Sequence, residues 1–292
     1  MIFAFIQEHK EHPVARWAGF FEVSTSGYYT WRKEHPDRQS RLDAYGDQIE
    51  EIFDESGGSY GADRIAGELR KRGIPASFCK VKRIMAARGL FSVHLRYRRG
   101  LTDSRGARDE DCGNLLENVA ITTPFQALSS DITYIPAGEG FAYTCTVRDI
   151  RSGVVLAERT ADHMKKELVL ETIRAAANSW RLPKGTVFHS DRGSQYTSAA
   201  VRQLLRKLGL RQSFSRTGKP GDNTWSESFF SILKRELIHP HGRYATREEA
   251  RQSIFAYIHG FYNTRRIQKN LGYLSPMEWL NRYYNSTLGI TA

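Results

Sequence analysis

Three carboxylates stand out because of where they lie in the predicted secondary structure. Asp131 is within a predicted strand, Asp191 comes just after another, and Glu227 is in the first turns of a predicted helix. If the two strands are neighbours in one sheet, the aspartates meet and the helix can bring the glutamate to them. Converging carboxylates repel one another unless cations lie between them, and oxygen-rich clusters suit Mg²⁺ or Mn²⁺. Two such ions commonly catalyse displacement at a phosphodiester, by activating the attacking oxygen and stabilising the leaving one.

The joint spacing of these acids is more informative than any one of them, because a single aspartate at a strand end is usually a local cap. Fifty-nine residues separate Asp131 from Asp191, and thirty-five separate Asp191 from Glu227. The elements around them must therefore bring together residues that are far apart in the chain.

The second half of the chain predicts the elements that position the acids. Its predicted strands are 129–135, 141–149, 154–158, 186–189 and 210–214, and its predicted helices are 164–180, 198–208, 223–238 and 246–262. An irregular tail is expected after the last helix. Three strands in a meander, followed by alternating helices and strands, predict an α/β domain with a mixed sheet.

The first hundred residues predict helices instead. Apolar periodicity indicates helices over 14–21, 41–55, 62–72 and 78–88. Ser24-Thr25-Ser26-Gly27 has turn and N-cap chemistry, and Ser77 is expected to cap the helix over 78–88. The last two helices, joined by Gly73-Ile74-Pro75, have the outline of a helix-turn-helix. A plain helical hairpin with charged outer faces is the alternative.

The charge is strongly and unevenly basic. The chain has 43 Lys and Arg against 32 Asp and Glu, a net charge of +11. Residues 64–108 alone hold thirteen Lys and Arg and two acids. Such a segment is the electrostatic signature of a nucleic-acid binder; a solvated basic surface with a charged linker is the alternative.

Composition excludes several other classes of protein. Apolar residues make up 40% of the chain and charged residues 26%, as in a globular protein. No apolar run is long enough to span a membrane, and the apolar start, residues 1–6, is too short for a signal peptide. The cysteines, at 79, 112 and 145, are odd in number and widely spaced, so no disulfide framework is expected. We expect a reducing location, the cytoplasm or the bacterial nucleoid.

Several stretches resemble one family, the insertion-sequence transposases with a retroviral-integrase-type Asp-Asp-Glu core. The similarity is to the second-frame, catalytic protein of the members with two overlapping reading frames. The matching stretches are SDITYI (130–135), HSDRGSQY (189–196), DNTWSESFF (222–230), YNTRR (262–266), LGYLSP (271–276), SGYY (26–29) and YGADRI (60–65). Two positions differ from the family pattern: Leu128 replaces a usual tryptophan, and Gln268 replaces a frequent histidine.

The resemblance implies an RNase H-like mixed-sheet core and a DNA strand transferase. Asp131, Asp191 and Glu227 would be both the catalytic residues and the ligands of two Mg²⁺ or Mn²⁺ ions. Water would cut the DNA, and the freed 3′-hydroxyl would attack a second phosphodiester, with no covalent protein intermediate. The alternatives are an RNase H-type nuclease and a non-catalytic DNA-binding regulator of transposition.

Several residues are candidates for contact with DNA. Positions 223, 227, 231 and 234 share one face of the predicted helix, so Asn223 and Lys234 would lie beside Glu227. Lys234 would hold a phosphate unless it is an ordinary solvated lysine. The further candidates are Arg83, Arg88, Arg98, Arg99, Arg216, Lys219, Arg265 and Arg266. For His189, a hydrogen-bonded core position is preferred over proton transfer. Gly193 would allow close approach of the backbone to metal or DNA, or would be a simple turn glycine.

These inferences divide the chain into four parts. Residues 1–92 would be a helical DNA-binding region, 93–124 a basic linker, 125–240 the catalytic core, and 241–292 its C-terminal helical extension. The expected partners are element-end and target DNA and further copies of the chain in a homo-oligomer on DNA. The resemblance also implies an upstream-frame protein with a helix-turn-helix and a leucine zipper, as partner or fusion. Without it, we expect little preference for element ends.

Overall fold

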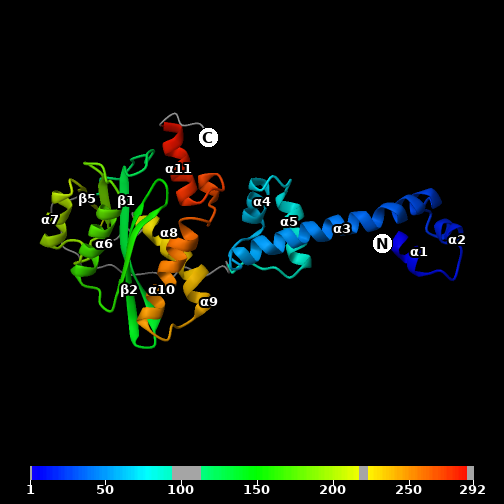
Figure 1. Ribbon diagram of the computed structural model, residues 1–292, viewed down its shortest axis with the longest axis horizontal. Coiled ribbons are helices and arrows are strands. Elements are labelled where there is room, and N and C mark those ends of the chain that lie inside the picture. The colour runs from blue at the N-terminus through cyan, green and yellow to red at the C-terminus, as the bar shows by residue number, and fades with distance from the viewer. Residues whose placement is uncertain (1, 94–112, 217–222, 288–292) are drawn as a thin grey trace. The chain divides into compact units, whose positions relative to one another are not determined.

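The computed structural model of the chain describes residues 2–93, 113–216 and 223–287 (Figure 1). The side chains of 35–42 lie outside this description. Two compact units are present, Met1–Phe91 and Ser92–Ala292.

The second unit contains a five-stranded sheet. Its strands are β1 (Ala127–Ala137), β2 (Gly140–Asp149), β3 (Val155–Ala161), β4 (Val187–Ser190) and β5 (Arg211–Phe214). Their order is β3-β2-β1-β4-β5, in which β2 runs antiparallel to β1 and β3, and β4 runs parallel to β1 and β5. The predicted mixed sheet is confirmed. All residues of β4 are buried, as expected for a short strand covered on both faces.

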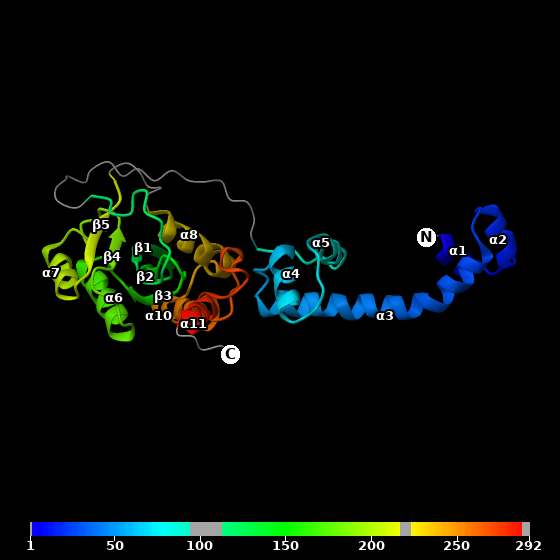
Figure 2. The same cartoon turned by 90° about the horizontal axis from the view of Figure 1, so that it is seen from above.

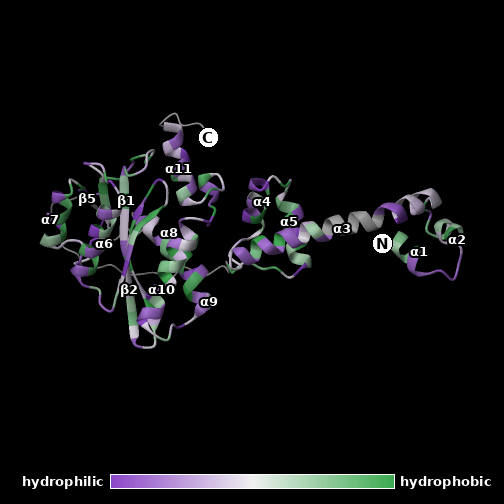
Figure 3. Cartoon of the chain, in the orientation of Figure 1, coloured by the Kyte–Doolittle hydropathy of each residue, from purple (hydrophilic) through white to green (hydrophobic). Residues whose placement is uncertain are grey.

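Helices cover both faces of this sheet (Figure 1). On one face, α6 (Lys166–Ser179) and α7 (Ala199–Lys207) pack on a core that includes Leu128, Val147 and Phe188. On the other, α8 (Thr224–Leu233) and α10 (Arg247–Phe255) pack over Ile135 and Ala142. These helices carry hydrophobic and hydrophilic residues on different sides (Figure 3), as amphipathic helices on a sheet do.

Both predicted C-terminal helices end in π-helical turns. The α8 helix continues as η2 (Lys234–Ile238) and the short α9 (His239–His241), and α10 continues as η3 (Ala256–Tyr262). Single π-helical turns within α-helices are uncommon and are often found at functional sites.

The expected irregular tail is wrong in part. After a 3-10 turn, η4 (Lys269–Leu271), the chain forms α11 (Pro276–Thr287), and Leu280 is buried against the core beneath α6 and α7. Ser275 and Glu278 cap the start reciprocally: the Ser275 N–H donates to Glu278 Oε2 at 2.8 Å, and the Glu278 N–H to Ser275 Oγ at 3.3 Å. This capping box, with Pro276 at the helix start, was a readable signal.

The first unit is helical, as predicted. Its helices are α1 (Ile2–Glu8), α2 (Val14–Phe20), α3 (Thr25–Glu55), α4 (Ala62–Lys71) and α5 (Phe78–Ala87). The N-cap chemistry of Ser24 and Ser77 is confirmed, since their hydroxyls accept hydrogen bonds from the N–H groups of Gly27 and Lys80.

The long helix α3 differs from the sequence-based expectation of a helix beginning near residue 41. The intervening stretch has no apolar stripe and contains Pro36, both of which argue against a helix. Packing at each end explains the continuity: Tyr28 is buried near its start, and Ile49 and Ile52 are buried near its end.

The expected linker is shorter than predicted, because residues 113–124 belong to the sheet unit. Leu116 is buried against Ala127 and Val187, and the Leu115 N–H donates to Ser213 Oγ at 3.0 Å. The rest of that linker, 94–112, lies outside the described residues. In the described part of the chain, no helix is long and apolar enough to cross a membrane.

Candidate active site

Asp131 and Asp191 come from neighbouring parallel strands. β1 and β4 pair with Ser129 opposite His189, and each aspartate follows its residue of this pair by two positions. Parallel strands in register therefore bring the two acids to the same level of the sheet. The prediction that these two strands are neighbours is confirmed.

The alternation of β1 determines which face Asp131 occupies. Residues two apart on a strand point to the same face, so Asp131 shares a face with Ile135 and Ala137. Both of these pack in the core beneath α8 and α10. Asp131 therefore faces the side of the sheet that α8 covers.

Glu227 lies in the first turn of α8, on its exposed side. Phe229, Phe230 and Leu233 hold the helix to the sheet from the opposite side. Of the positions predicted to share this face, 227 and 231 are exposed and 234 is half-buried, whereas 223 is buried. The helix therefore brings Glu227 to the same face of the sheet as Asp131.

The electrostatics of Asp131 show that these acids interact. Burial, together with the charges of Asp191 and Glu227, raises the pKa of Asp131 to about 7, against a hydrogen bond from the Ile132 N–H (2.8 Å) and the charge of Lys234. The pKa of Asp191 is also raised, by burial, against a hydrogen bond from the Gly193 N–H at 3.0 Å. Deprotonating Asp131 is therefore costly unless a cation approaches.

The side chains of the three carboxylates are not arranged as a complete metal-binding site. Among the residues that the structure describes, no three Asp, Glu, His or Cys side chains are arranged so that they could hold a metal ion. The two aspartates are neighbours, and Glu227 interacts with Asp131 through charge.

Lys234 directly follows α8, as the first residue of η2, and lies close to this cluster. Its Nζ is 5.0 Å from the centroid of the Tyr134 ring, a cation–π distance. Burial lowers the pKa of Lys234, and the charge of Asp131 opposes this. The lysine is thus half-buried beside Asp131 rather than an ordinary solvated surface residue.

Asn223 differs from its expected role as an open contact. The residue is 5% exposed, and its Oδ1 has no hydrogen-bond partner among the described residues. Gly193 permits a close approach, as predicted, but to a protein group: a Cβ there would meet Asp191 Oδ1 at 3.1 Å and Gln195 Oε1 at 2.9 Å. Its small size therefore lets the loop fold around Asp191.

The core position of His189 is confirmed. The ring is fully buried, with Nδ1 2.9 Å from Ser213 Oγ and Nε2 3.2 Å from Ser215 Oγ. With both nitrogens hydrogen-bonded to serines, one within β5 and one directly after it, the ring has a structural role.

A buried pair of hydroxyl groups lies beneath the aspartates and was not predicted from the sequence. Tyr196 OH lies 2.9 Å from Ser130 Oγ, and both residues are buried. Ser130 precedes Asp131, and Tyr196 ends the loop that begins at Asp191. The pair therefore ties the two acid-bearing segments together. The spacing of these two residues in the sequence does not predict their contact, although Tyr196 lies in one of the stretches that match the family.

The predicted DNA contact of Arg266 is wrong. Its side chain is 1% exposed and donates to Glu236 through Nε at 2.7 Å and Nη2 at 2.6 Å. Tyr257 OH donates to the same carboxylate at 2.7 Å. A guanidinium enclosed in this way has no surface open to a phosphate, and it stabilises the junction of η2 and η3.

The other arginines predicted to contact DNA differ in their exposure and in their hydrogen-bond partners. Arg88 is paired with Asp47 and Glu50 at 2.8 Å each. Arg83 is exposed on α5. Arg216 pairs with Glu117, and Arg265 donates to the Gly260 carbonyl at 2.9 Å. The remaining candidates, Arg98, Arg99 and Lys219, lie outside the described residues.

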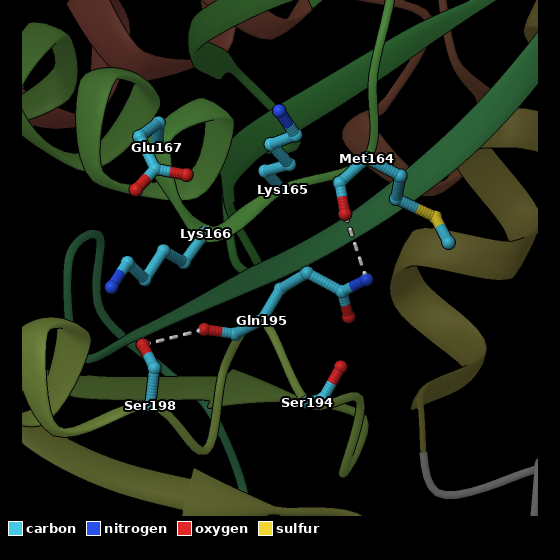
Figure 4. A pocket seen from close by; sticks show the side chains of 7 residues that line it. All are labelled: Met164, Lys165, Lys166, Glu167, Ser194, Gln195 and Ser198. Carbon is cyan, nitrogen blue, oxygen red and sulfur yellow. Dashed lines mark hydrogen bonds between the residues drawn. The ribbon is translucent and has the colours of Figure 1, made fainter.

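An open depression of about 340 Å³ adjoins the Asp191 loop (Figure 4). Gln195 Nε2 donates to the Met164 carbonyl at 3.0 Å, and Ser198 Oγ donates to the Gln195 carbonyl at 2.9 Å. The first bond joins the loop to the segment before α6, and the second joins it to the start of α7. The lining residues are Met164, Lys165, Lys166, Glu167, Ser194, Gln195 and Ser198. Its lysines and hydroxyls provide donors suited to a phosphate.

Family models match most of the chain. Models described as integrase core domains match residues 122–220 and 227–284, and an HTH-like domain matches 41–99. The first two matches contain all three carboxylates.

Individual proteins are similar over nearly their whole length. The transposase for insertion sequence element IS904 of Lactococcus lactis is 34% identical, over 85% of this chain and 97% of its own. The transposase InsF for insertion sequence IS3A of Escherichia coli is 31% identical, over 97% and 99%. The catalytic core domain of BIV integrase aligns over 56% of this chain and 98% of its own, at 18% identity and a TM-score of 0.43.

Proposed function

Because the chain belongs to the insertion-sequence transposases with an integrase core domain, we propose that Asp131, Asp191 and Glu227 are its catalytic residues. Its function is that of a transposase, and its sheet unit has the RNase H-like α/β fold. The observation that carries the assignment is the register of β1 and β4, from which Asp131 and Asp191 emerge at one level.

The chemistry of the donors fits divalent metal ions. The three acids offer oxygen ligands only, which Mg²⁺ and Mn²⁺ prefer. Burial first, and then the charges of Asp191 and Glu227, raise the pKa of Asp131 to about 7, and a cation would balance those charges. When bound, two ions would supply activation of the attacking oxygen and stabilisation of the leaving one.

The proposed reaction has two displacements in one site. Water attacks the phosphorus at the element end, and the bond to the 3′-oxygen breaks, leaving a 3′-hydroxyl and a 5′-phosphate. That 3′-hydroxyl then attacks a target phosphodiester, forming a new bond to phosphorus and releasing a target 3′-hydroxyl. Lys234, beside Asp131, holds a non-bridging phosphate oxygen in both steps.

DNA binding is proposed to use both units of the chain. The HTH-like segment carries the exposed Arg83 on α5, and the depression beside the Asp191 loop offers Lys165 and Lys166. We further propose that several copies act together on DNA in the nucleoid, with the upstream-frame protein as partner or fusion.

A strand-transfer assay tests the proposal. Purified protein is incubated with Mg²⁺, labelled duplexes of the element ends, and supercoiled plasmid. Joined products that disappear in EDTA support a strand transferase. Hydrolysis without joining would indicate a nuclease, and binding without either reaction would indicate a regulator.

A further inference from the structure

The first three helices have a core of their own. Ile6, Ala18 and Tyr28, from α1, α2 and the start of α3, are 2–3% exposed. The Phe5 ring meets the Trp17 ring edge-on, with centroids 5.3 Å apart. Residues 2–33 are therefore more than a frayed end, because they form a small three-helix arrangement (Figure 2). Aromatic rings of α1 and α2 contact each other within it.

The second and third of these helices are joined by a tight turn. The α2 helix ends at Phe20 and α3 begins at Thr25. The Val23 N–H donates to the Ala18 carbonyl at 2.9 Å, which closes the turn on α2, and Ser24 caps α3 through the Gly27 N–H at 3.2 Å. A supporting helix, a short turn and a capped second helix around a shared core make up a helix-turn-helix.

The outer face of the second helix is polar and basic. Ser26, Tyr29, Thr30 and Lys33 follow helical spacing and are all exposed, whereas Tyr28 points into the core. Ser26 Oγ lies 2.6 Å from Ser24 Oγ, which leaves Tyr29, Thr30 and Lys33 as the projecting groups. No carboxylate occurs between Thr25 and Lys33.

We propose that Val14–Lys33 is a second helix-turn-helix, separate from the HTH-like segment at 41–99, and that the start of α3 enters the major groove of element-end DNA. Tyr29, Thr30 and Lys33 then reach base edges. The major groove admits one helix, and residues in the N-terminal turns of a recognition helix contact the bases. The inference rests on the proposed function only in taking DNA as the ligand.

The chemistry of this face favours DNA over a protein partner. Hydroxyls and an ammonium group can donate to base acceptors, and the absence of acids avoids repulsion from phosphates. Among the described residues of the first three helices, the exposed Phe ring is that of Phe20, which lies on α2 and is 75% exposed. The expectation of little end preference assumed that the upstream-frame protein supplies the end-specific contacts. With α3 reading bases, the isolated chain should show a preference.

The test is selection of duplexes from a randomised pool by the full-length protein in EDTA, where no cleavage occurs. Wild type should enrich a motif. Tyr29→Ala and Thr30→Val should each relax adjacent positions of that motif, lowering discrimination there roughly 5- to 150-fold, with affinity for scrambled DNA little changed. Phe20→Ala is the matched control, since it removes an exposed ring of the same unit outside the α3 face, and it should keep the wild-type motif.

Three outcomes would overturn the inference: no motif for wild type, an unchanged motif in both α3 variants, or a motif that changes in Arg83→Ala but not in Tyr29→Ala. Loss of self-association in Phe20→Ala and Tyr29→Ala together, with DNA selection unchanged, would make the face a contact between copies instead. Circular dichroism confirms that each variant is folded. Nicking of plasmid with Mn²⁺ reports the catalytic unit separately, so failure of the proposed chemistry is distinguishable from failure of recognition.

Discussion

Arg266 and Glu236 form a bidentate ion pair in which both side chains are 1% exposed. The pair joins the π-helical turn η2, which begins at Lys234, to the chain that follows η3. Glu236 and Lys234 belong to the same turn, η2. Loss of the ion pair should therefore affect the position of Lys234 as well as the stability of the protein.

Arg266→Met should be strongly destabilising, because it leaves Glu236 buried without its cation. Removing one partner of a buried pair costs about 3–5 kcal/mol. Urea unfolding measures the change, and Arg265→Met, at the exposed neighbouring position, should lie near wild type. An Arg266→Met protein as stable as Arg265→Met would show that the pair contributes little.

Asp131→Asn, Asp191→Asn and Glu227→Gln should each reduce Mg²⁺-dependent cleavage and joining by at least about 10³-fold, because each removes one negatively charged metal ligand. Folding and DNA binding should persist. Asp162→Asn is the control, since that acid is exposed and its side chain is 65% accessible. Near-normal turnover in any one of the three variants would remove that residue from the site.

The stability of the metal-free protein should depend on Asp131 in a defined direction. An acid whose pKa rises on folding, here to about 7, favours the native state while protonated, and this contribution is lost as the pH rises from about 4 through 7. Asp131→Asn should therefore be more stable than wild type near pH 8, by on the order of 1–3 kcal/mol, and similar to it near pH 4.

Thermal unfolding in EDTA across this pH range measures the effect. Millimolar Mg²⁺ should then stabilise wild type and leave Asp131→Asn unchanged, because binding to the native state raises its stability. A variant that is less stable than wild type at high pH would contradict the electrostatic account.

Salt dependence of DNA binding should separate Arg83 from Arg88. Each phosphate contact contributes roughly 0.9 to the log–log slope. Arg83→Ala should therefore flatten the slope by about one unit. Arg88→Ala should flatten it less, because Arg88 is already engaged with Asp47 and Glu50, and should lower stability instead. Equal flattening by both would mean that Arg88 leaves its acids to bind DNA.

Local sequence determined the secondary structure where one signal acts over a few residues. Alternation identified the strands around Asp131, and serine caps marked the starts of α3 and α5. A capping box at Ser275 and Glu278 begins α11. Its residues are recognisable in the sequence, although this helix was not predicted. These features follow from contacts within one or two turns, so a single sequence suffices to find them.

Tertiary structure decided the features that depend on distant partners. The α3 helix runs past residues without a helical pattern because both of its ends are packed. Arg266 resembled a surface arginine until Glu236, thirty positions earlier in the chain, was placed beside it. Only the pairing of β1 with β4 sets Asp131 level with Asp191. Strand order and register arise from burial of the whole sheet, so no short stretch of sequence contains them.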